Sequence, residues 1–407
     1  MKNAVRLAYL VSHPIQYQAP LLRRIAQEPD IDLTVFFGSD FSVRGYKDEG
    51  FGVGVKWDVP LLDGYKHEFL PAIRDNATVG IASPVNYGIV NRLRGGKDGQ
   101  AAFDLLWVHG YSTVNALHGM VAAKSLGIPV LLRAEPWLGD RERSGAKLAA
   151  KQLFFKMLRQ LVDGVLPIGT LNAAYWRHYL GEDFPLSPMP YAVDNEYFQQ
   201  KSREARAGRE KLLTALNLDA TRPVILFASK LQSRKRCEDL LEAYVRLSPG
   251  PGIEPHPYLV IVGDGEERAN LERKAGASGF SGIRFCGFQN QSELPRYFDI
   301  ASVFVLPSRH EPWGLIVNEV MNAGRAVIIS NEVGCGTDLI TDGVEGCIFP
   351  AGNVEALTGA LRRVLATPET AAEMGKHGLE RIRTWSFEED IRGLRRAIAL
   401  VTRKISA

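Results

Sequence analysis

Two glutamates separated by seven residues, Glu311 and Glu319, enclose the stretch of this sequence best suited to chemistry. The turn at 312–314 leads into an apolar run that predicts a helix starting near Gly314. Unpaired N–H groups at such a helix start can bind a diphosphate, and glycine lets a phosphate approach the backbone closely. Glu319 lies four residues beyond Leu315, on the same helical face, where a carboxylate suits two neighbouring sugar hydroxyls. The alternative is an ordinary amphipathic helix, with Glu311 as a capping residue and Glu319 solvated.

Three cations, Lys230, Arg234 and Lys235, follow the apolar strand predicted at 224–228. Ligands of parallel α/β sheets sit outside the carboxyl ends of the strands, which is where these side chains fall. A departing nucleoside diphosphate accumulates negative charge, and positioned lysine or arginine stabilises it. The alternative for a run of cations is a solvated loop.

Polar residues also follow two predicted strands of the N-terminal half. His109 comes directly after the strand at 103–108, on the side of the sheet where ligands bind, so position favours a functional role. Arg133 and Glu135 follow the strand at 128–132. They suit either an acceptor's hydroxyl groups or an ion pair.

The chain alternates short β-rich runs with helical runs, which predicts parallel sheets covered on both faces. The first set of predicted strands lies at 5–11, 31–37, 103–108 and 128–132, with a helix at 114–126, and the second set lies at 223–228, 258–262, 283–286, 303–306 and 326–329. The predicted fold class is therefore α/β, with two Rossmann-like doubly wound domains facing a cleft.

We place the N-terminal, acceptor-side domain at 1–200 and the nucleotide-sugar-binding domain at 201–386, with a charged linker at about 199–221. The amphipathic helix predicted at 387–403 is expected to pack back on the first domain. The glycine-rich stretch at 38–64 predicts a long loop that is either functional or mobile.

Composition narrows the function classes. With 407 residues, 23% charged and 45% hydrophobic, the chain is typical of a globular protein, and its net charge of +3 does not favour nucleic-acid binding. No run of about 18 apolar residues predicts a membrane span, and no signal peptide is evident, so a cytoplasmic location is expected. The four cysteines show no metal-binding or disulfide spacing, and are expected to be small buried residues: Cys237, Cys286, Cys335 and Cys347.

The two glutamates, with Pro-aromatic-Gly after the first, resemble the signature of retaining glycosyltransferases of family four, which have the GT-B fold. The resemblance implies that Glu311 contacts the transferred sugar and that Glu319 binds the donor ribose. The amides of Gly314 and Leu315 would meet sugar and diphosphate. The remaining donor-binding candidates of this segment are Trp313, which stands where the family has phenylalanine, and Ile316.

The same resemblance extends to the preceding loops. Lys230 takes the position of the family's arginine and Lys235 that of its lysine, with Arg234 as a further cation. Gly263 begins a Gly-Asp-Gly stretch similar to the family's next donor loop, although a tight turn is the alternative. Phe288 falls where the base would lie, and a core aromatic is the alternative there.

In the N-terminal half, the resemblance places His109 beside the transferred sugar. The segment 13–17, His-Pro-Ile-Gln-Tyr, looks like a bacterial polysaccharide-biosynthesis branch of the family. Ser12 and His13 are therefore candidates for contacts with the donor phosphates or the acceptor.

Together these features predict a metal-independent, retaining glycosyltransferase of the hexosyltransferase class that needs no cofactor beyond its nucleotide diphosphate sugar. The expected acceptor is a sugar or a lipid-linked saccharide. The alternatives are an enzyme like a nucleotide-sugar 2-epimerase and a non-catalytic nucleotide-sugar-binding partner. The basic, apolar stretch at 147–159 fits a solvated helix face or peripheral contact with the inner face of an anionic membrane, as a lipid-linked acceptor would require.

Overall fold

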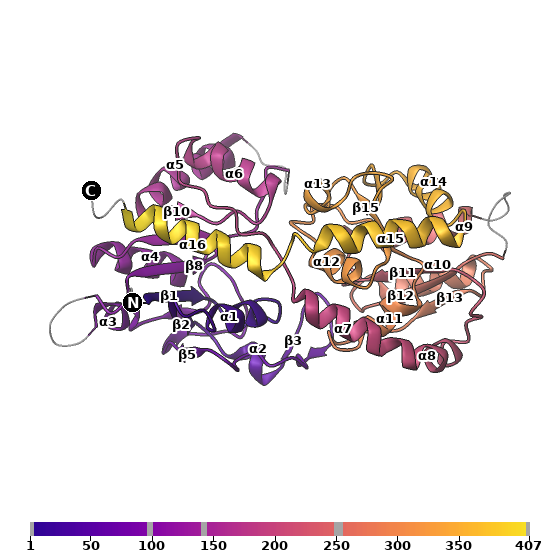
Figure 1. Ribbon diagram of the computed structural model, residues 1–407, viewed down its shortest axis with the longest axis horizontal. Coiled ribbons are helices and arrows are strands. Elements are labelled where there is room, and N and C mark those ends of the chain that lie inside the picture. The colour runs from indigo at the N-terminus through magenta and orange to yellow at the C-terminus, as the bar shows by residue number, and fades with distance from the viewer. Residues whose placement is uncertain (1–3, 96–100, 140–144, 248–254, 404–407) are drawn as a thin grey trace. The chain divides into compact units, whose positions relative to one another are not determined.

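The computed structural model describes residues 4–95, 101–139, 145–247 and 255–403, which form two compact units (Figure 1). Unit 1 comprises Met1–Tyr46, Val59–Tyr191 and Phe387–Ala407. Unit 2 comprises Lys47–Asp58 and Ala192–Ser386. The chain therefore crosses between the units four times.

Unit 1 is built on a six-stranded parallel sheet with the order β10-β9-β8-β1-β2-β5. Its strands are β1 (Val5–Val11), β2 (Ile31–Phe37), β5 (Lys66–Phe69), β8 (Leu105–His109), β9 (Val130–Arg133) and β10 (Gly164–Val165). Residues 7–11 of β1 are all buried, as expected for a central strand with both faces covered.

The helices of unit 1 are α1 (Ala19–Ile25), α2 (Phe41–Arg44), α3 (Ile89–Arg94), α4 (Val114–Ser125), α5 (Gly145–Leu161), α6 (Thr170–Leu180) and α16 (Phe387–Arg403). Two small two-stranded elements accompany them. In one, β3 (Tyr46–Lys47) pairs with β4 (Gly54–Val55), at and beyond the crossing into unit 2, and in the other β6 (Ala72–Arg74) pairs antiparallel with β7 (Val85–Asn86). Helix α4 begins at a capping threonine, Thr113, whose hydroxyl accepts from the Ala116 N–H.

Unit 2 repeats the architecture with the strand order β13-β12-β11-β14-β15-β16. Its strands are β11 (Val224–Ala228), β12 (Tyr258–Val262), β13 (Ile283–Phe285), β14 (Val303–Leu306), β15 (Ala326–Ser330) and β16 (Gly346–Phe349). Its helices are α7 (Asn195–Ala205), α8 (Arg209–Ala215), α9 (Cys237–Arg246), α10 (Arg268–Ala277), α11 (Leu294–Ile300), α12 (Leu315–Asn322), α13 (Gly336–Leu339), α14 (Val354–Val364) and α15 (Pro368–Ile382), with single 3₁₀ turns at 206–208 and 233–235.

Each sheet reverses its winding direction once. In unit 1 the reversal lies between β1 and β8, and in unit 2 it lies between β11 and β14. The connections on either side of such a point turn to opposite faces of the sheet, which leaves a crevice at the carboxyl ends of the two strands. The loops that follow these four strands are therefore the parts of the fold that can hold a ligand.

Helix α16 belongs to unit 1, where its yellow ribbon lies beside β10 and α1 (Figure 1). Its Asp390 pairs with Arg133 of β9 at 3.2 Å, and both side chains are buried. Arg395 forms a salt bridge with Asp30, and Ser187 donates a hydrogen bond of 2.7 Å to the Gly393 carbonyl. Polar contacts therefore tie α16 to β9 and to the loops at Asp30 and Ser187.

The structure differs from the sequence prediction in which segments belong to each domain. The predicted linker at 199–221 is wrong, because most of it is helical: α7 begins at the capping residue Asp194, and α8 buries Leu212 and Leu213. Unit 2 accordingly begins at Ala192 rather than at residue 201. Part of the glycine-rich stretch, Lys47–Asp58, also belongs to unit 2. Within the described ranges, no helix is both long and apolar enough to cross a membrane.

Candidate functional site

At the winding reversal of unit 2, the loops after β11 and β14 lie side by side. The Arg309 N–H donates to the Arg234 carbonyl at 2.7 Å, which joins the two loops directly. Lys235 from the first loop donates to the carboxylate of Glu311 from the second. The guanidinium of Arg234 lies 3.6 Å from the same carboxylate. The fold thus brings together three residues that sequence reasoning had selected from separate segments.

The Lys235–Glu311 pair is almost fully enclosed, with exposed fractions of 7% and 9%. Burial lowers the pKa of Lys235, an effect that the charge of Glu311 opposes and that of Arg234 reinforces. A buried ion pair of this kind costs desolvation free energy and is weak evidence of stabilisation. Its position at a winding reversal therefore favours a role in binding or catalysis.

Helix α12 starts beside this pair. Its N-terminal cap is Gly314, with φ of 94°, a conformation that glycine adopts without strain. A Cβ there would lie 3.0 Å from a methyl group of Val333 and 3.2 Å from one of Leu306. Leu315 and Ile316, in the first turn, are half-buried. The helix start is thus tightly packed on one side, while its first turn keeps some access to solvent.

Trp313 was predicted to line the donor site, and the structure shows its indole enclosed by other residues of unit 2. Its indole is 3% exposed and stacks on Trp385, with ring centroids 5.6 Å apart. The indole N–H donates to the side chain of Asn318 at 2.9 Å. Trp313 is therefore a core residue of unit 2. Its hydrogen bond with Asn318 connects the large ring to α12.

Glu319 lies on α12 and is 8% exposed. Burial raises the pKa of Glu319 to about 8, and a hydrogen bond with Gln291 opposes this shift. Within the described part of the chain, its Oε2 atom has no hydrogen-bond partner. A buried acceptor without a donor is costly, and a ligand hydroxyl would satisfy it.

The loops after β11 and β12 also meet. The Leu231 N–H donates to the Asp264 carbonyl at 2.8 Å. A Cβ on Gly263, whose φ is 134°, would lie 1.9 Å from the Ser229 carbonyl oxygen, so only glycine allows this approach. Lys230, in between, forms a salt bridge with Asp48 at 2.7 Å.

Phe288, the predicted base-stacking residue, is half-buried. Its ring packs edge-on against Phe51, with centroids 4.8 Å apart, and lies 6.4 Å from the ring of Trp57. It is thus not a residue of the central core, because its neighbours come from the Lys47–Asp58 segment.

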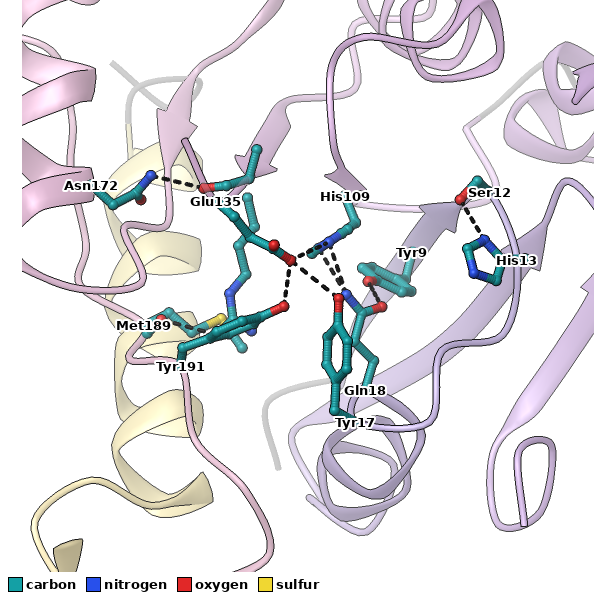
Figure 2. Close-up of polar contacts among 12 residues, drawn as sticks. Tyr9, Ser12, His13, Tyr17, Gln18, His109, Glu135, Asn172, Met189 and Tyr191 are labelled. Atoms are coloured by element: carbon teal, nitrogen blue, oxygen red, sulfur yellow. Dashed lines mark hydrogen bonds and ion pairs between the residues drawn. The ribbon is translucent and has the colours of Figure 1, made fainter. Parts of the chain in front are cut away.

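Unit 1 has its own polar cluster at the winding reversal (Figure 2). The amide nitrogen of Gln18, at the start of α1, lies 2.9 Å from Nε2 of His109, at the end of β8. The carbonyl oxygen of that amide accepts a hydrogen bond of 2.7 Å from Tyr9. The Nε2 atom of His109 lies 3.7 Å from the carboxylate of Glu135. Residues that follow three different strands thus converge here.

Two tyrosines complete the cluster around Glu135. Tyr17 donates to its carboxylate at 3.2 Å, and Tyr191 donates to the same oxygen (Figure 2). Burial alone would raise the pKa of Glu135, but the hydrogen bonds with His109, Tyr191 and Tyr17 hold it below its usual value. Sequence reasoning missed Gln18, Tyr17 and the role of Tyr191. Tyr17 ends the segment 13–17 singled out above and Gln18 directly follows it, which was the available signal.

Ser12 and His13 lie in the same loop but contact each other rather than the cluster. The Ser12 hydroxyl is 2.9 Å from Nδ1 of His13, and the His13 ring packs on Phe41. Burial lowers the pKa of His13 to about 4, and nearby His109 adds to the shift, so this imidazole is neutral near pH 7.

Arg133 was a candidate for contacting acceptor hydroxyls or pairing with Glu135, and the structure supports neither. Its guanidinium is buried, where it donates to the carbonyls of Met189 and Pro190 and pairs with Asp390. Burial raises the pKa of Asp390 to about 7, against the opposing charge of Arg133. Arg133 is therefore a structural residue that anchors α16.

The described residues include no group of three or more His, Cys, Asp or Glu side chains arranged to hold a metal ion. Of the four cysteines, Cys286 is half-buried and the other three are buried, and all four thiols are free.

Comparison with solved structures identifies the class of fold. HepE from Anabaena, solved in complex with UDP and glucose, has a TM-score of 0.70 and 15% sequence identity, and the alignment covers 97% of this chain and 99% of that one. Sucrose-phosphate synthase from Thermosynechococcus elongatus has a TM-score of 0.67 and 18% identity, with 99% and 100% covered. The chain has the GT-B fold of such glycosyltransferases.

Sequence comparison adds the family of the second unit. Residues 208–381 match the family model described as glycosyl transferases group 1, so unit 2 contains a glycosyltransferase group 1 domain. The alpha-D-kanosaminyltransferase of Streptomyces kanamyceticus is 29% identical over 44% of this chain and 45% of its own length. The lipopolysaccharide core biosynthesis glycosyltransferase LpsE of Rhizobium meliloti is 31% identical over 40% and 46%. The chain thus matches a little under half the length of these two relatives.

Proposed function

We propose that this protein is a retaining glycosyltransferase that moves a glycosyl group from a nucleotide diphosphate sugar to a sugar or lipid-linked saccharide acceptor. The observation that carries the proposal is the buried Lys235–Glu311 pair beside the start of α12. The family match of unit 2 and the names of its relatives support it. The solved complex of HepE with UDP and glucose supports the choice of donor.

In the proposed reaction, the diphosphate is held by three cations and by the first turn of α12. The cations are Lys235, Arg234 and Lys230, and the turn includes Leu315 and Ile316. The bond between the anomeric carbon and the phosphate oxygen breaks, and the acceptor oxygen bonds to that carbon on the face that the diphosphate leaves. The acceptor proton passes to an oxygen of the departing diphosphate. Glu311 orients the donor sugar and stabilises positive charge on its ring, while Glu319 accepts from the ribose hydroxyls.

In the proposal, the polar cluster of unit 1 contacts the acceptor and the transferred sugar. His109, held by Gln18 and Glu135, is assigned to the transferred sugar. Glu135 keeps its negative charge because hydrogen bonds lower its pKa. A carboxylate flanked by an imidazole and two phenols is suited to orienting hydroxyl groups, the groups that saccharides offer.

We also propose that the reaction needs no metal ion, because the cations of unit 2 supply the positive charge that a diphosphate leaving group requires. Turnover should therefore persist in the presence of EDTA. Loss of activity on chelation, with recovery on adding Mg²⁺ or Mn²⁺, would contradict this part of the proposal.

The proposal is tested by incubating the protein with a panel of nucleotide diphosphate sugars and simple glycoside acceptors. We expect one donor to yield a glycosylated product and free nucleoside diphosphate, with the anomeric configuration of the donor kept, as NMR of the product would show. An inverted product would overturn retention. Epimerisation at C2 without transfer would favour an epimerase, and donor binding with neither transfer nor hydrolysis would favour a binding partner.

A peripheral membrane contact is proposed for helix α5. Its sequence contains no acidic residue, and its outer surface exposes Leu153, Met157 and Lys156, with exposed fractions of 61% and 56% for the first two. Lys151 instead lies over the rings of Tyr175 and Tyr179 and so faces inward. Apolar side chains beside a cation are typical of helices that lie on anionic lipid.

Sedimentation with vesicles tests this contact. We expect the protein to bind vesicles that contain anionic lipid, and the double variant Leu153→Ser/Met157→Ser to lose most of that binding. Val344→Ser, which removes an exposed apolar side chain of unit 2, serves as the matched control. Equal binding by all three proteins would count against α5 as the contact.

A further inference from the structure

The segment Lys47–Asp58 is separated in sequence from the rest of unit 2 but packs with it. Strands β3 and β4 pair within this part of the chain, and the Asp48 N–H donates to the Val53 carbonyl at 3.0 Å. Gly52, with φ of 70°, donates to the Asp48 carbonyl at 2.8 Å and closes the turn. The result is a small hairpin lying on the loops assigned above to the donor.

Two residues of the hairpin, Asp48 and Phe51, contact Lys230. Both carboxylate oxygens of Asp48 accept from the Lys230 ammonium, at 2.7 and 2.9 Å. The same ammonium lies 4.8 Å from the centre of the Phe51 ring, within the range of a cation–π contact. The N–H groups of Gly50 and Phe51 donate to Asp48 at 2.9 Å each. Asp48 is thus fixed on the hairpin side before it meets the lysine.

Lys230 is left only partly enclosed by this contact. Its side chain is 32% exposed, against 10% for that of Asp48. Burial alone would raise the pKa of Asp48, but the hydrogen bonds from Lys230 and the backbone lower it, so the carboxylate stays charged. A lysine has a flexible four-carbon stem, and a fixed counter-ion restricts the positions that its ammonium can take.

The hairpin also contacts the loop that carries Phe288. Phe51 and Trp57 both contact the Phe288 ring, and Asn290 donates to the Lys56 carbonyl at 2.8 Å. Asp58 accepts from the Ser292 hydroxyl. The same loop carries Gln291, whose side chain lowers the pKa of Glu319, the residue assigned to the ribose.

The hairpin therefore touches three parts of the site assigned to a nucleotide: the cation Lys230, the aromatic ring expected at the base, and the loop that carries Gln291. It also approaches the glycine loop, because a Cβ on Gly265 would lie 2.9 Å from the Gly50 carbonyl oxygen. Contacts of this breadth are not needed merely to fasten a surface loop to the domain.

We propose that two residues of Lys47–Asp58 belong to the donor site: Asp48 is a positioning residue for Lys230, and Phe51, together with Phe288, forms the aromatic wall that receives the nucleobase. This inference rests on the proposed function, since it takes unit 2 to bind a nucleotide diphosphate sugar. It assigns to a segment of the N-terminal half of the sequence a part in selecting the donor.

Calorimetric titration can separate the two roles if two probes are used. Inorganic pyrophosphate reports on the cations alone. A nucleoside diphosphate, chosen as the tightest of UDP, ADP and GDP on the unaltered protein, reports on the cations and the base together. Glu49→Gln is the matched control for Asp48→Asn, because Glu49 is the exposed neighbouring carboxylate on the same hairpin.

Asp48→Asn should weaken the binding of both probes by about tenfold, the scale of losing one charge-assisted hydrogen bond. Glu49→Gln should bind both as the unaltered protein does. In a Lys230→Met background, Asp48→Asn should have no further effect, because Asp48 acts through the lysine. Unchanged or tighter binding by Asp48→Asn, with an intact thermal transition, would overturn the positioning role.

Phe51→Ala should weaken the nucleoside diphosphate by about fivefold and pyrophosphate by less than twofold, because ring contacts serve the base. Phe51→Tyr, which keeps the ring, should restore nucleotide binding. Equal losses for both probes would overturn the role of Phe51 at the base. If the unaltered protein binds no nucleoside diphosphate, the proposed function fails, and this inference fails with it. If it binds and no hairpin variant changes the affinity, only the inference fails.

Discussion

The two units share one topology but carry opposite chemistry at their winding reversals. Unit 2 gathers Lys235, Arg234 and Glu311 beside the start of a helix, so cations dominate. Unit 1 places one carboxylate, Glu135, among an imidazole, an amide and phenols. A twisted parallel sheet thus fixes where a ligand can bind, while the loops after its strands decide which ligand charge is met there.

The difference fits a reaction that separates charge. A departing diphosphate needs fixed positive charge, which costs little reorganisation when the cations are already in place. An acceptor hydroxyl needs hydrogen-bond partners and orientation instead, which neutral groups and a single carboxylate can supply. Substituting residues of each unit in turn tests whether the two units have these different roles.

The largest effect is expected in unit 2. Glu311→Gln and Lys235→Met should each lower kcat by about a hundredfold or more, because each removes one preorganised charge. Steady-state kinetics with the best donor would measure the loss. The exposed neighbours Glu210→Gln and Lys211→Met on α8 are matched controls and should keep full activity. Normal turnover by both site variants would remove the basis of the proposed function.

A smaller effect is expected in unit 1. Glu135→Gln keeps the size of the side chain but removes its charge, so the hydrogen bonds from Tyr17 and Tyr191 weaken. We expect kcat to fall about tenfold and the KM of the acceptor to rise, with the KM of the donor unchanged. The exposed Glu182→Gln is the control. A change confined to the donor KM would contradict the division of roles between the units.

Glu319 should couple donor binding to pH. Because burial raises its pKa to about 8, the folded protein holds a proton there at pH 7 that the unfolded chain, with a pKa near 4.3, does not. The stability contributed by this proton therefore falls as pH rises from about 4.3 to 8. Ribose hydroxyls donate best to the ionised carboxylate, so nucleotide binding should release a proton.

Calorimetry of nucleoside diphosphate binding in two buffers of different ionisation enthalpy would count that proton. We expect up to one proton released at pH 7, fewer above pH 8, and none for Glu319→Gln. Proton uptake, or the same release by the variant, would show that Glu319 does not meet the nucleotide.

The smallest effect on the reaction is expected for Trp313→Phe. Because this indole packs on Trp385 inside unit 2, its loss should leave the KM of the donor within about twofold. Loss of the hydrogen bond that the indole donates to Asn318 should instead lower stability by about 0.5–1.5 kcal/mol, seen as a lower thermal midpoint. A change of donor preference would instead indicate that Trp313 lines the donor site.

Much of the fold was predictable because the strands are apolar runs bounded by turns. The ranges predicted for β1 and β2, at 5–11 and 31–37, agree with the structure, since those strands are the buried centre of their sheet. Helix α16 was predicted from its apolar spacing. Helices α7 and α8 were missed because their sequence is highly charged and only one face of each is buried.

The residues of the site were predictable to the extent that they follow strands. Glu311 and Lys235 were found because loop position and residue type agreed. The burial of Trp313 was not predicted, because sequence does not show on which side of a turn a large ring packs. The roles of Arg133 and Asp48 depend on partners far away in the chain, Asp390 and Lys230, and no local pattern reveals such pairs.

The position of α16 in the sequence affects the order in which the two units can finish folding. During synthesis the strands of unit 1 emerge first, yet Arg133 and the acidic residues near β2 gain their partners only when the last helix has left the ribosome. Unit 2 lies between these two pieces and can finish folding earlier. Unit 1 is thus completed only after unit 2 has been made. For the same reason, a fragment that stops at Tyr191 would leave Arg133 buried without its counter-ion.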